Sequence, residues 1–224
     1  MKVLIFGATG MVGQGVLRQC LAAEDVSLVT VVGRTPVVQN HAKLQQCLQG
    51  DLLTLGEQAD QLRGFDACFF CLGVSSSGMS EEAYRQITYD LTLSVARLLA
   101  QLNPSLVFTY VSGAGADSTE HGRSMWARVK GKTENDLKKL PFSGVYLFRP
   151  GLIQPLHGIR SKTKMYQRFY SLAYPLLSLI RRVCPRLLVS TEDMGNAMLN
   201  AARARTGRVT VEARDIVRLA RGPA

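Results

Sequence analysis

The chain of 224 residues has little of several things that would define other classes of protein. Its five cysteines are an odd number without paired spacing, which excludes a disulfide framework and favours a reducing compartment. Its three histidines, His41, His121 and His157, are scattered without carboxylates at ligand spacing, so we expect no metal site. Residues 1–6 are typical of a strand and not of a signal peptide, so the sequence predicts a cytoplasmic protein.

Acidic residues are absent between Leu137 and Thr191, where ten basic residues occur. Removing these ten from the 27 basic residues of the chain leaves 17 against 17 acidic ones, so this segment carries the whole net charge of +10. Its apolar core, Phe169–Ile180, is too short to span a bilayer.

We interpret 152–190 as a small basic lobe on the substrate side. Within it, 160–186 has basic ends and an aromatic, leucine-rich middle, which suits an anionic membrane surface or a protein partner. The alternative is a helix docked on the core, where it would cover an apolar substrate pocket. No recognition motif accompanies the charge, so we expect no nucleic-acid partner.

A glycine motif follows the first apolar run: Lys2–Phe6 leads directly into Gly7-Ala8-Thr9-Gly10-Met11-Val12-Gly13. Apolar residues at helical spacing come next, which predicts a strand, a tight turn and a helix. In such a unit the first glycine makes the turn, the second lets a pyrophosphate approach the backbone, and the third packs the helix on the strand. A glycine-rich turn without a ligand is the alternative, but the position between strand and helix favours dinucleotide binding.

An acidic residue is missing where the second predicted strand, Leu28–Gly33, ends. Proteins specific for NAD place a carboxylate there on the ribose hydroxyls, whereas this chain has Arg34. A guanidinium suits a 2′-phosphate, so the sequence predicts NADP(H); the alternative is an ordinary surface arginine.

Strand and helix signals alternate along the chain. Further strands are expected at Leu44–Leu48, Asp66–Leu72, Leu106–Ser112 and Gly144–Phe148, and helices around Gly56–Arg63, Ser80–Leu102, Met125–Leu140 and after Thr191. This alternation predicts one α/β domain over 1–224, a Rossmann-type doubly wound parallel sheet with helices on both faces and a small C-terminal lobe. Cys68 and Cys71 fall on one strand and would face opposite sides, which favours two buried thiols over a redox pair.

Several of these motifs together resemble the atypical short-chain dehydrogenase/reductases, and most of all the branch of Tat-interacting-protein-like and NmrA-like proteins. They are the glycine motif, Gly50-Asp51-Leu52, Cys71-Leu72-Gly73, Val111-Ser112, Val129-Lys130-Gly131 and Phe148-Arg149-Pro150-Gly151. The resemblance implies a catalytic Ser112 and a Lys130 on the nicotinamide ribose. The coenzyme-binding residues are then Gly7, Thr9, Gly10, Met11, Val12, Gly13, Arg34, Asp51, Leu52, Cys71, Leu72, Gly73, Lys130 and Pro150.

One residue departs from that family pattern. The tyrosine expected four residues before the lysine is Trp126, and an indole cannot act as an acid in water. Tyr110 or Tyr84 could supply the missing phenol, and His121 could relay protons, although a loop histidine is more often solvated. We therefore expect a slow NADP(H)-dependent reductase of a small or lipophilic carbonyl or quinone; the alternative is a non-catalytic, NADP(H)-sensing regulatory or membrane-associated protein.

Overall fold

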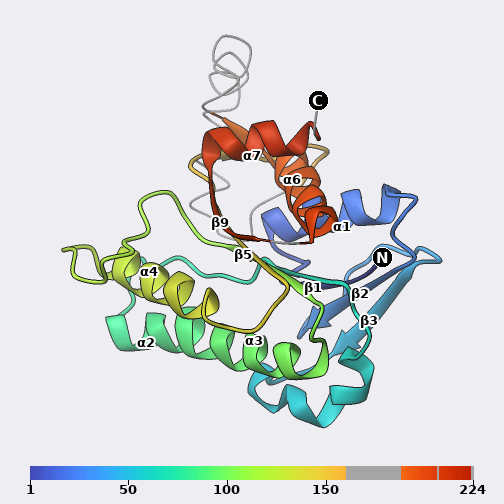
Figure 1. Cartoon of the computed structure of the whole chain (residues 1–224), viewed down its shortest axis with the longest axis horizontal. Helices are drawn as coiled ribbons and strands as arrows, with labels where there is room; N and C mark the ends of the chain where they lie inside the picture. The colour runs from blue at the N-terminus through green and yellow to red at the C-terminus, as the bar shows by residue number, and fades with distance from the viewer. Residues whose placement is uncertain (160–187, 206, 223–224) are drawn as a thin grey trace.

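A parallel sheet of seven strands forms the centre of the protein (Figure 1). The computed structural model describes residues 1–159, 188–205 and 207–222. Within these, the strands follow the order β3-β2-β1-β4-β5-β6-β9, each parallel to its neighbours. They are β1 (Lys2–Phe6), β2 (Leu28–Gly33), β3 (Leu44–Leu48), β4 (Ala67–Phe70), β5 (Val107–Val111), β6 (Gly144–Arg149) and β9 (Gly207–Glu212).

Two helical layers cover the sheet. One consists of α1 (Met11–Ala22), α6 (Thr191–Ala204) and α7 (Ala213–Ala220), and the other of α2 (Glu81–Arg85), α3 (Leu91–Leu102) and α4 (Met125–Leu137) (Figure 1). Alternate residues of β1 supply the two cores: Val3 and Ile5 pack toward α1 and α6, while Leu4 and Phe6 pack toward α3. The predicted doubly wound Rossmann-type sheet is confirmed.

Strand order reverses direction at β1, because β2 lies on one side of it and β4 on the other. In open sheets of this kind the crevice outside the carboxyl ends at such a switch point holds the ligand. The loops that follow β1, β2 and β4 therefore border the crevice in which a ligand is expected.

Some element boundaries differ from the sequence prediction. The helix expected over 80–102 contains a π-helical turn, η2 (Gln86–Asp90), and the helix expected at 56–63 is an irregular 3₁₀ segment, η1 (Leu52–Leu62). The α4 helix ends at Leu137, short of the expected Leu140. Neither β9 nor α7 was predicted, since exposed residues of an edge strand carry a weak apolar pattern.

The cysteine prediction is confirmed for the opposite facing of the two side chains and for the burial of Cys68, whereas Cys71 is only half-buried. Cys68 is buried in the core on the α3 side, whereas Cys71 packs against the core on the α1 side, and neither forms a disulfide. Burial raises the pKa of both thiols, which keeps them protonated at neutral pH.

The basic segment 160–186 lies outside the described residues, and so does most of the lobe predicted over 152–190. The described parts of that lobe pair in a small parallel sheet, β7 (Ile153–Gln154) with β8 (Val189–Ser190). No helix among the described residues has both the length and the apolar character needed to cross a membrane. The cytoplasmic location stays a prediction.

Candidate functional site

The glycine loop between β1 and α1 is shaped by close backbone contacts. Gly7 has φ +78°, and a Cβ there would lie 2.7 Å from the Leu72 nitrogen. A Cβ on Gly13 would lie 2.1 Å from the carbonyl oxygen of Gly7, so only glycine lets the helix start this close to the strand. Gly10 is the N-cap of α1 and no side chain caps this helix end, so its first amide groups can bind an anion.

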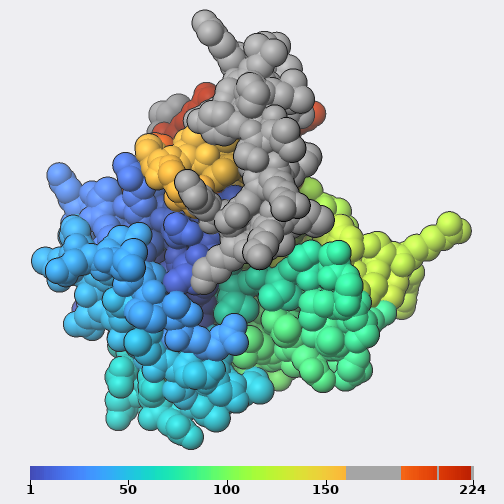
Figure 2. All heavy atoms as spheres, turned by 180° about the vertical axis from the view of Figure 1, so that it is seen from behind, coloured from blue at the N-terminus to red at the C-terminus, as the bar shows by residue number. Residues whose placement is uncertain are grey.

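A cleft of about 360 Å³ lies beyond the carboxyl ends of β1, β2 and β4. Two segments far apart in sequence lie side by side on this face (Figure 2). They are residues 1–50, coloured blue and light blue, and the residues near 90, coloured green. Predicted coenzyme residues that line it are Gly7, Thr9, Gly10, Arg34, Asp51, Leu52, Cys71, Leu72 and Gly73. Met11, Val12 and Gly13 follow in the first turn of α1, and Lys130 and Pro150 lie beyond its lining.

Arg34 lies exposed at the rim of this cleft and forms no ion pair with any described residue. Its loop is held by Gln46 of β3, whose amide accepts a hydrogen bond from the Val37 N–H at 2.9 Å and donates one to the Val37 carbonyl at 3.2 Å. Asp51 caps η1 by accepting from the Leu53 N–H at 2.9 Å. Within the described part of the chain, the Arg34 guanidinium thus lies at the end of β2 without an ion-pair partner.

Lys130 of α4 points at the end of β5. Its Nζ donates to the Tyr110 hydroxyl at 3.1 Å and to the Val111 carbonyl at 3.2 Å, and lies 4.8 Å from the centre of the Tyr110 ring. Burial lowers the pKa of Lys130 to about 8, against a weaker opposing effect of Glu134. Tyr110 is fully buried, which raises the pKa of its phenol well above its ordinary value, and the nearby Tyr84 adds to that rise.

Ser112 directly precedes a glycine loop, residues 113–115, on which the Trp126 ring packs. The Ser112 hydroxyl is buried and finds no hydrogen-bond partner among the described residues. The indole of Trp126 lies on the loop itself, with ring atoms 3.5 Å from a Cβ placed on Gly113 and 3.7 Å from one on Gly115. The indole therefore packs on the loop that directly follows Ser112 in the chain.

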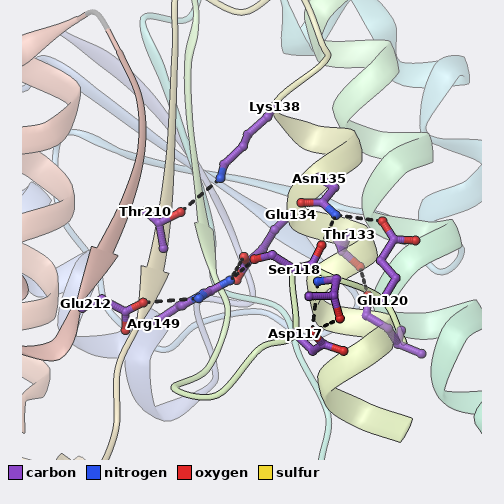
Figure 3. A network of polar contacts seen from close by, with 12 residues as sticks. Asp117, Ser118, Glu120, Thr133, Glu134, Asn135, Lys138, Arg149, Thr210 and Glu212 are labelled. Atoms are coloured by element: carbon purple, nitrogen blue, oxygen red, sulfur yellow. Dashed lines mark hydrogen bonds and ion pairs between the residues drawn. The ribbon is translucent and has the colours of Figure 1, made fainter. Parts of the chain in front are cut away.

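An ion network holds α4 against the rest of the site (Figure 3). Arg149, at the end of β6, binds the fully buried Glu134 through two nitrogens, with Nε–Oε1 at 2.9 Å. It also donates to the Ser118 hydroxyl at 2.8 Å and contacts Glu212 of β9 at 3.3 Å. The geometry is the paired arrangement in which arginine binds carboxylate most strongly.

The loop from residue 113 to residue 124 is packed onto the same helix. A Cβ on Gly131 would lie 1.7 Å from the Asp117 carbonyl oxygen, so the two backbones touch. The Asp117 carboxylate accepts hydrogen bonds from the Thr119 hydroxyl at 2.7 Å and from the N–H groups of Gly122 and Thr119, which lowers its pKa. His121 is exposed in this loop. The described residues contain no cluster of side chains that could hold a metal ion.

Sequence reasoning missed the ion network and the role of Gln46. Arg149 was noticed only as part of a motif, although Lys130 and Glu134 lie one helical turn apart and Glu134 is an acid on a buried face. An acidic residue one turn from Lys130 on the apolar face of a helix was the signal that could have predicted a buried ion pair. Nothing in the local sequence connects Gln46 with the loop after β2.

Comparisons with known proteins agree with this architecture. Residues 3–125 match the NAD dependent epimerase/dehydratase family. Protein HTATIP2 of Rattus norvegicus is 29% identical over 154 residues, covering 68% of this chain and 62% of that protein. Protein fmp52-1, mitochondrial, of Aspergillus oryzae is 31% identical over 155 residues, covering 66% of this chain and 64% of that protein. The matched region thus spans less than two thirds of either relative.

Solved structures share the fold. WbmF of Bordetella bronchiseptica in complex with NAD⁺ has a TM-score of 0.68 at 16% identity, covering 98% of this chain and 76% of that one. The UDP-N-acetylglucosamine 4-epimerase of Bacillus cereus has a TM-score of 0.69 at 16% identity, covering 95% and 75%. The predicted resemblance to atypical short-chain dehydrogenase/reductases is confirmed, and the chain belongs to the NAD dependent epimerase/dehydratase family.

Proposed function

We propose that this protein binds NADP(H) and is a slow reductase of a small or lipophilic carbonyl or quinone. The observation that carries the proposal is the free guanidinium of Arg34 at the rim of the glycine-lined cleft. A phosphate at that end would gain a charge-assisted hydrogen bond, whereas a ribose hydroxyl would gain much less.

The cleft suits a dinucleotide. A Cβ added at Gly33 or Gly73, both in the cleft wall, would meet no atom within 4 Å and would project into the space that the coenzyme needs. Arg34 would hold the 2′-phosphate, Asp51 and Leu52 would flank the adenine, and the amide groups at the start of α1 would bind the pyrophosphate.

The chemistry follows from the residues at the end of β5. A bound nicotinamide coenzyme would supply a hydride. The unpaired hydroxyl of Ser112 would hold the substrate oxygen, and Lys130, with a pKa of about 8, would be able to exchange a proton near neutral pH. Turnover would be slow because Trp126 provides no ionisable phenol.

A second function is favoured by one specific contact. Lys130 is already hydrogen-bonded to the buried Tyr110 and to a backbone carbonyl, so its ammonium is occupied. A protein that binds NADP(H) without turning it over, and signals through a partner, would keep such an arrangement. Tight NADPH binding with no turnover of any carbonyl or quinone would support it.

Titration with NADPH and NADH tests the coenzyme assignment. The wild type should bind NADPH more tightly, and Arg34→Ala should remove most of that difference, about 1.5–3 kcal/mol for a charge-assisted contact. Arg221→Ala is the matched control, because Arg221 is exposed at the end of α7, which follows the opposite edge strand of the sheet. Equal affinities of the wild type for the two coenzymes would refute the assignment.

A further inference from the structure

A second hollow, of about 400 Å³, lies beside α1 and shares no lining residue with the coenzyme cleft. Its walls come from three parts of the chain, which are α1, the loop between β2 and β3, and the turn that follows β7. We call it the α1 hollow. None of the residues that line it is acidic: they are Gln14, Leu17, Arg18, Leu21, Ala22, Gln39, His41, His157, Gly158 and Ile159.

Arg18 gives the α1 hollow its positive charge. This arginine is exposed and forms no ion pair with any described residue. The last turn of α1 carries the negative end of the helix dipole, but Lys43 binds there through its Nζ, which donates to the Ala23 carbonyl at 2.7 Å. An anion beside Arg18 would therefore find an unpaired guanidinium next to a helix end whose partial charge is already offset.

The two histidines of the α1 hollow each have one ring nitrogen engaged. The Nδ1 of His41 accepts the Lys43 N–H at 3.1 Å, so the ring proton lies on Nε2, which is then a hydrogen-bond donor. The Nε2 of His157 lies 3.0 Å from Oε2 of Glu192, so this carboxylate already has a partner. His41 therefore adds an N–H donor to the guanidinium of Arg18, and donors of this kind bind carboxylate or phosphate oxygens.

The turn that carries His157 is held in place by the fold. His157 and Gly158 have φ +56° and +74°, and the Ile159 N–H closes the turn by donating to the Leu156 carbonyl at 3.1 Å. The Leu156 N–H in turn donates to the hydroxyl of Thr191, the first residue of α6, at 3.1 Å. A histidine with positive φ persists only where its surroundings fix it. This wall of the hollow is therefore formed without a ligand.

We propose that the α1 hollow binds small organic anions, carboxylates or phosphate monoesters that carry an alkyl chain of medium length. The anionic head would bind Arg18 and His41, and the chain would lie against Leu21 and Ile159, which are half-buried apolar residues of the lining. A volume of about 400 Å³ is within the range of small-molecule sites. The proposal does not depend on the reductase function, because the two sites have separate linings.

Calorimetric titration of the full chain with octanoate and octyl phosphate tests the site, and the tighter probe identifies the preferred head group. Arg18→Gln should lower the affinity for the tighter probe about five- to tenfold, because a charge-assisted hydrogen bond near the surface is lost. Arg214→Gln is the matched control: it removes an exposed arginine of α7 and should change the affinity by less than about twofold. Acetate and 1-octanol, which have only the head or only the chain, should bind at least about tenfold more weakly than octanoate.

Proton NMR of the histidine rings locates the bound probe, because the chain has three histidines. The tighter probe should shift the Cε1–H signals of His41 and His157, which line the hollow, and leave the signal of His121 unchanged. The variants His41→Gln and His157→Gln assign these signals.

Four results would overturn the site. They are no binding of either probe, equal affinities of the wild type and Arg18→Gln, a histidine shift confined to His121, and a loss of affinity in Arg34→Ala as large as in Arg18→Gln. The last result would place the anion in the coenzyme cleft instead. The coenzyme titration is a separate measurement, so failure of the α1 hollow and failure of the proposed function are distinguished.

Discussion

The two halves of the site are held together in different ways. The coenzyme half, around Gly7, Gly13 and Arg34, is shaped by backbone atoms that approach one another so closely that a methyl group would collide. The proposed catalytic half, around Ser112, Trp126 and Lys130, is shaped by side chains, so a single substitution there would change the chemistry that the site can perform. The shape of the coenzyme half depends on a few glycines, whereas proton donation in the catalytic half depends on a single ionisable side chain.

The largest expected effect comes from restoring the phenol in the catalytic half. Trp126→Tyr places a hydroxyl one helical turn from Lys130, and a positioned acid contributes about 10²–10⁴-fold to turnover. Stopped-flow oxidation of NADPH with naphthoquinone and an aldehyde measures it. Trp126→Phe is the control, since it keeps a ring without the hydroxyl and should stay slow.

Two results would contradict this assignment of the catalytic half. One is a Trp126→Tyr variant no faster than Trp126→Phe. The other is rapid wild-type turnover that survives Lys130→Ala, because the proton would then be supplied from elsewhere.

The buried ammonium of Lys130 should make stability depend on pH. Its pKa in the folded protein is lowered to about 8 from 10.5, so between these values the unfolded chain holds more protons and the free energy of unfolding rises with pH. The rise is about 3 kcal/mol in total. Denaturant unfolding at pH 7.5 and pH 10.5 should show this contribution in the wild type and its loss in Lys130→Met.

Lys132 provides the matched control for that measurement. It lies on the same helix but is half-exposed, and Asp136 raises its pKa. Lys132→Met should keep the rise between pH 8 and pH 10.5. A Lys130→Met variant with the same pH dependence as the wild type would show that the lysine is not buried as a charged group.

The smallest expected effects come from two glycine-to-alanine substitutions, one in each half of the site, whose losses of unfolding free energy should differ. Gly13→Ala would place a Cβ 2.1 Å from the Gly7 carbonyl oxygen, and such overpacking costs about 1–3 kcal/mol and should also weaken NADPH binding. Gly113→Ala would place a Cβ 3.5 Å from the Trp126 ring and should change the free energy of unfolding by less than about 0.5 kcal/mol. Equal losses in the two variants, measured by urea unfolding, would refute the contrast.

Much of the coenzyme half could be predicted from local sequence. The loop Gly7–Gly13, Arg34 and Gly73 follow directly from strand ends, and parallel strands bring those ends to one edge. Asp51 was expected there only because of the family resemblance. The catalytic half could be predicted less completely. The roles of Ser112 and Lys130 stay predictions that the family resemblance implies. The hydrogen bond from Lys130 to Tyr110 could not be predicted, because it joins residues 20 positions apart on different elements.

The sequence by itself determined the alternation of strands and helices, the glycine turn and the arginine that replaces an acid, since each depends on neighbours in the chain. The tertiary structure alone decided that β9 extends the sheet beside β6. It also decided that Arg149 binds both Glu134 and Glu212, the latter 63 residues after Arg149. It also decided that the Trp126 ring lies on Gly113. These contacts depend on how the elements pack against one another. The spacing of residues along the chain does not determine which distant elements come together.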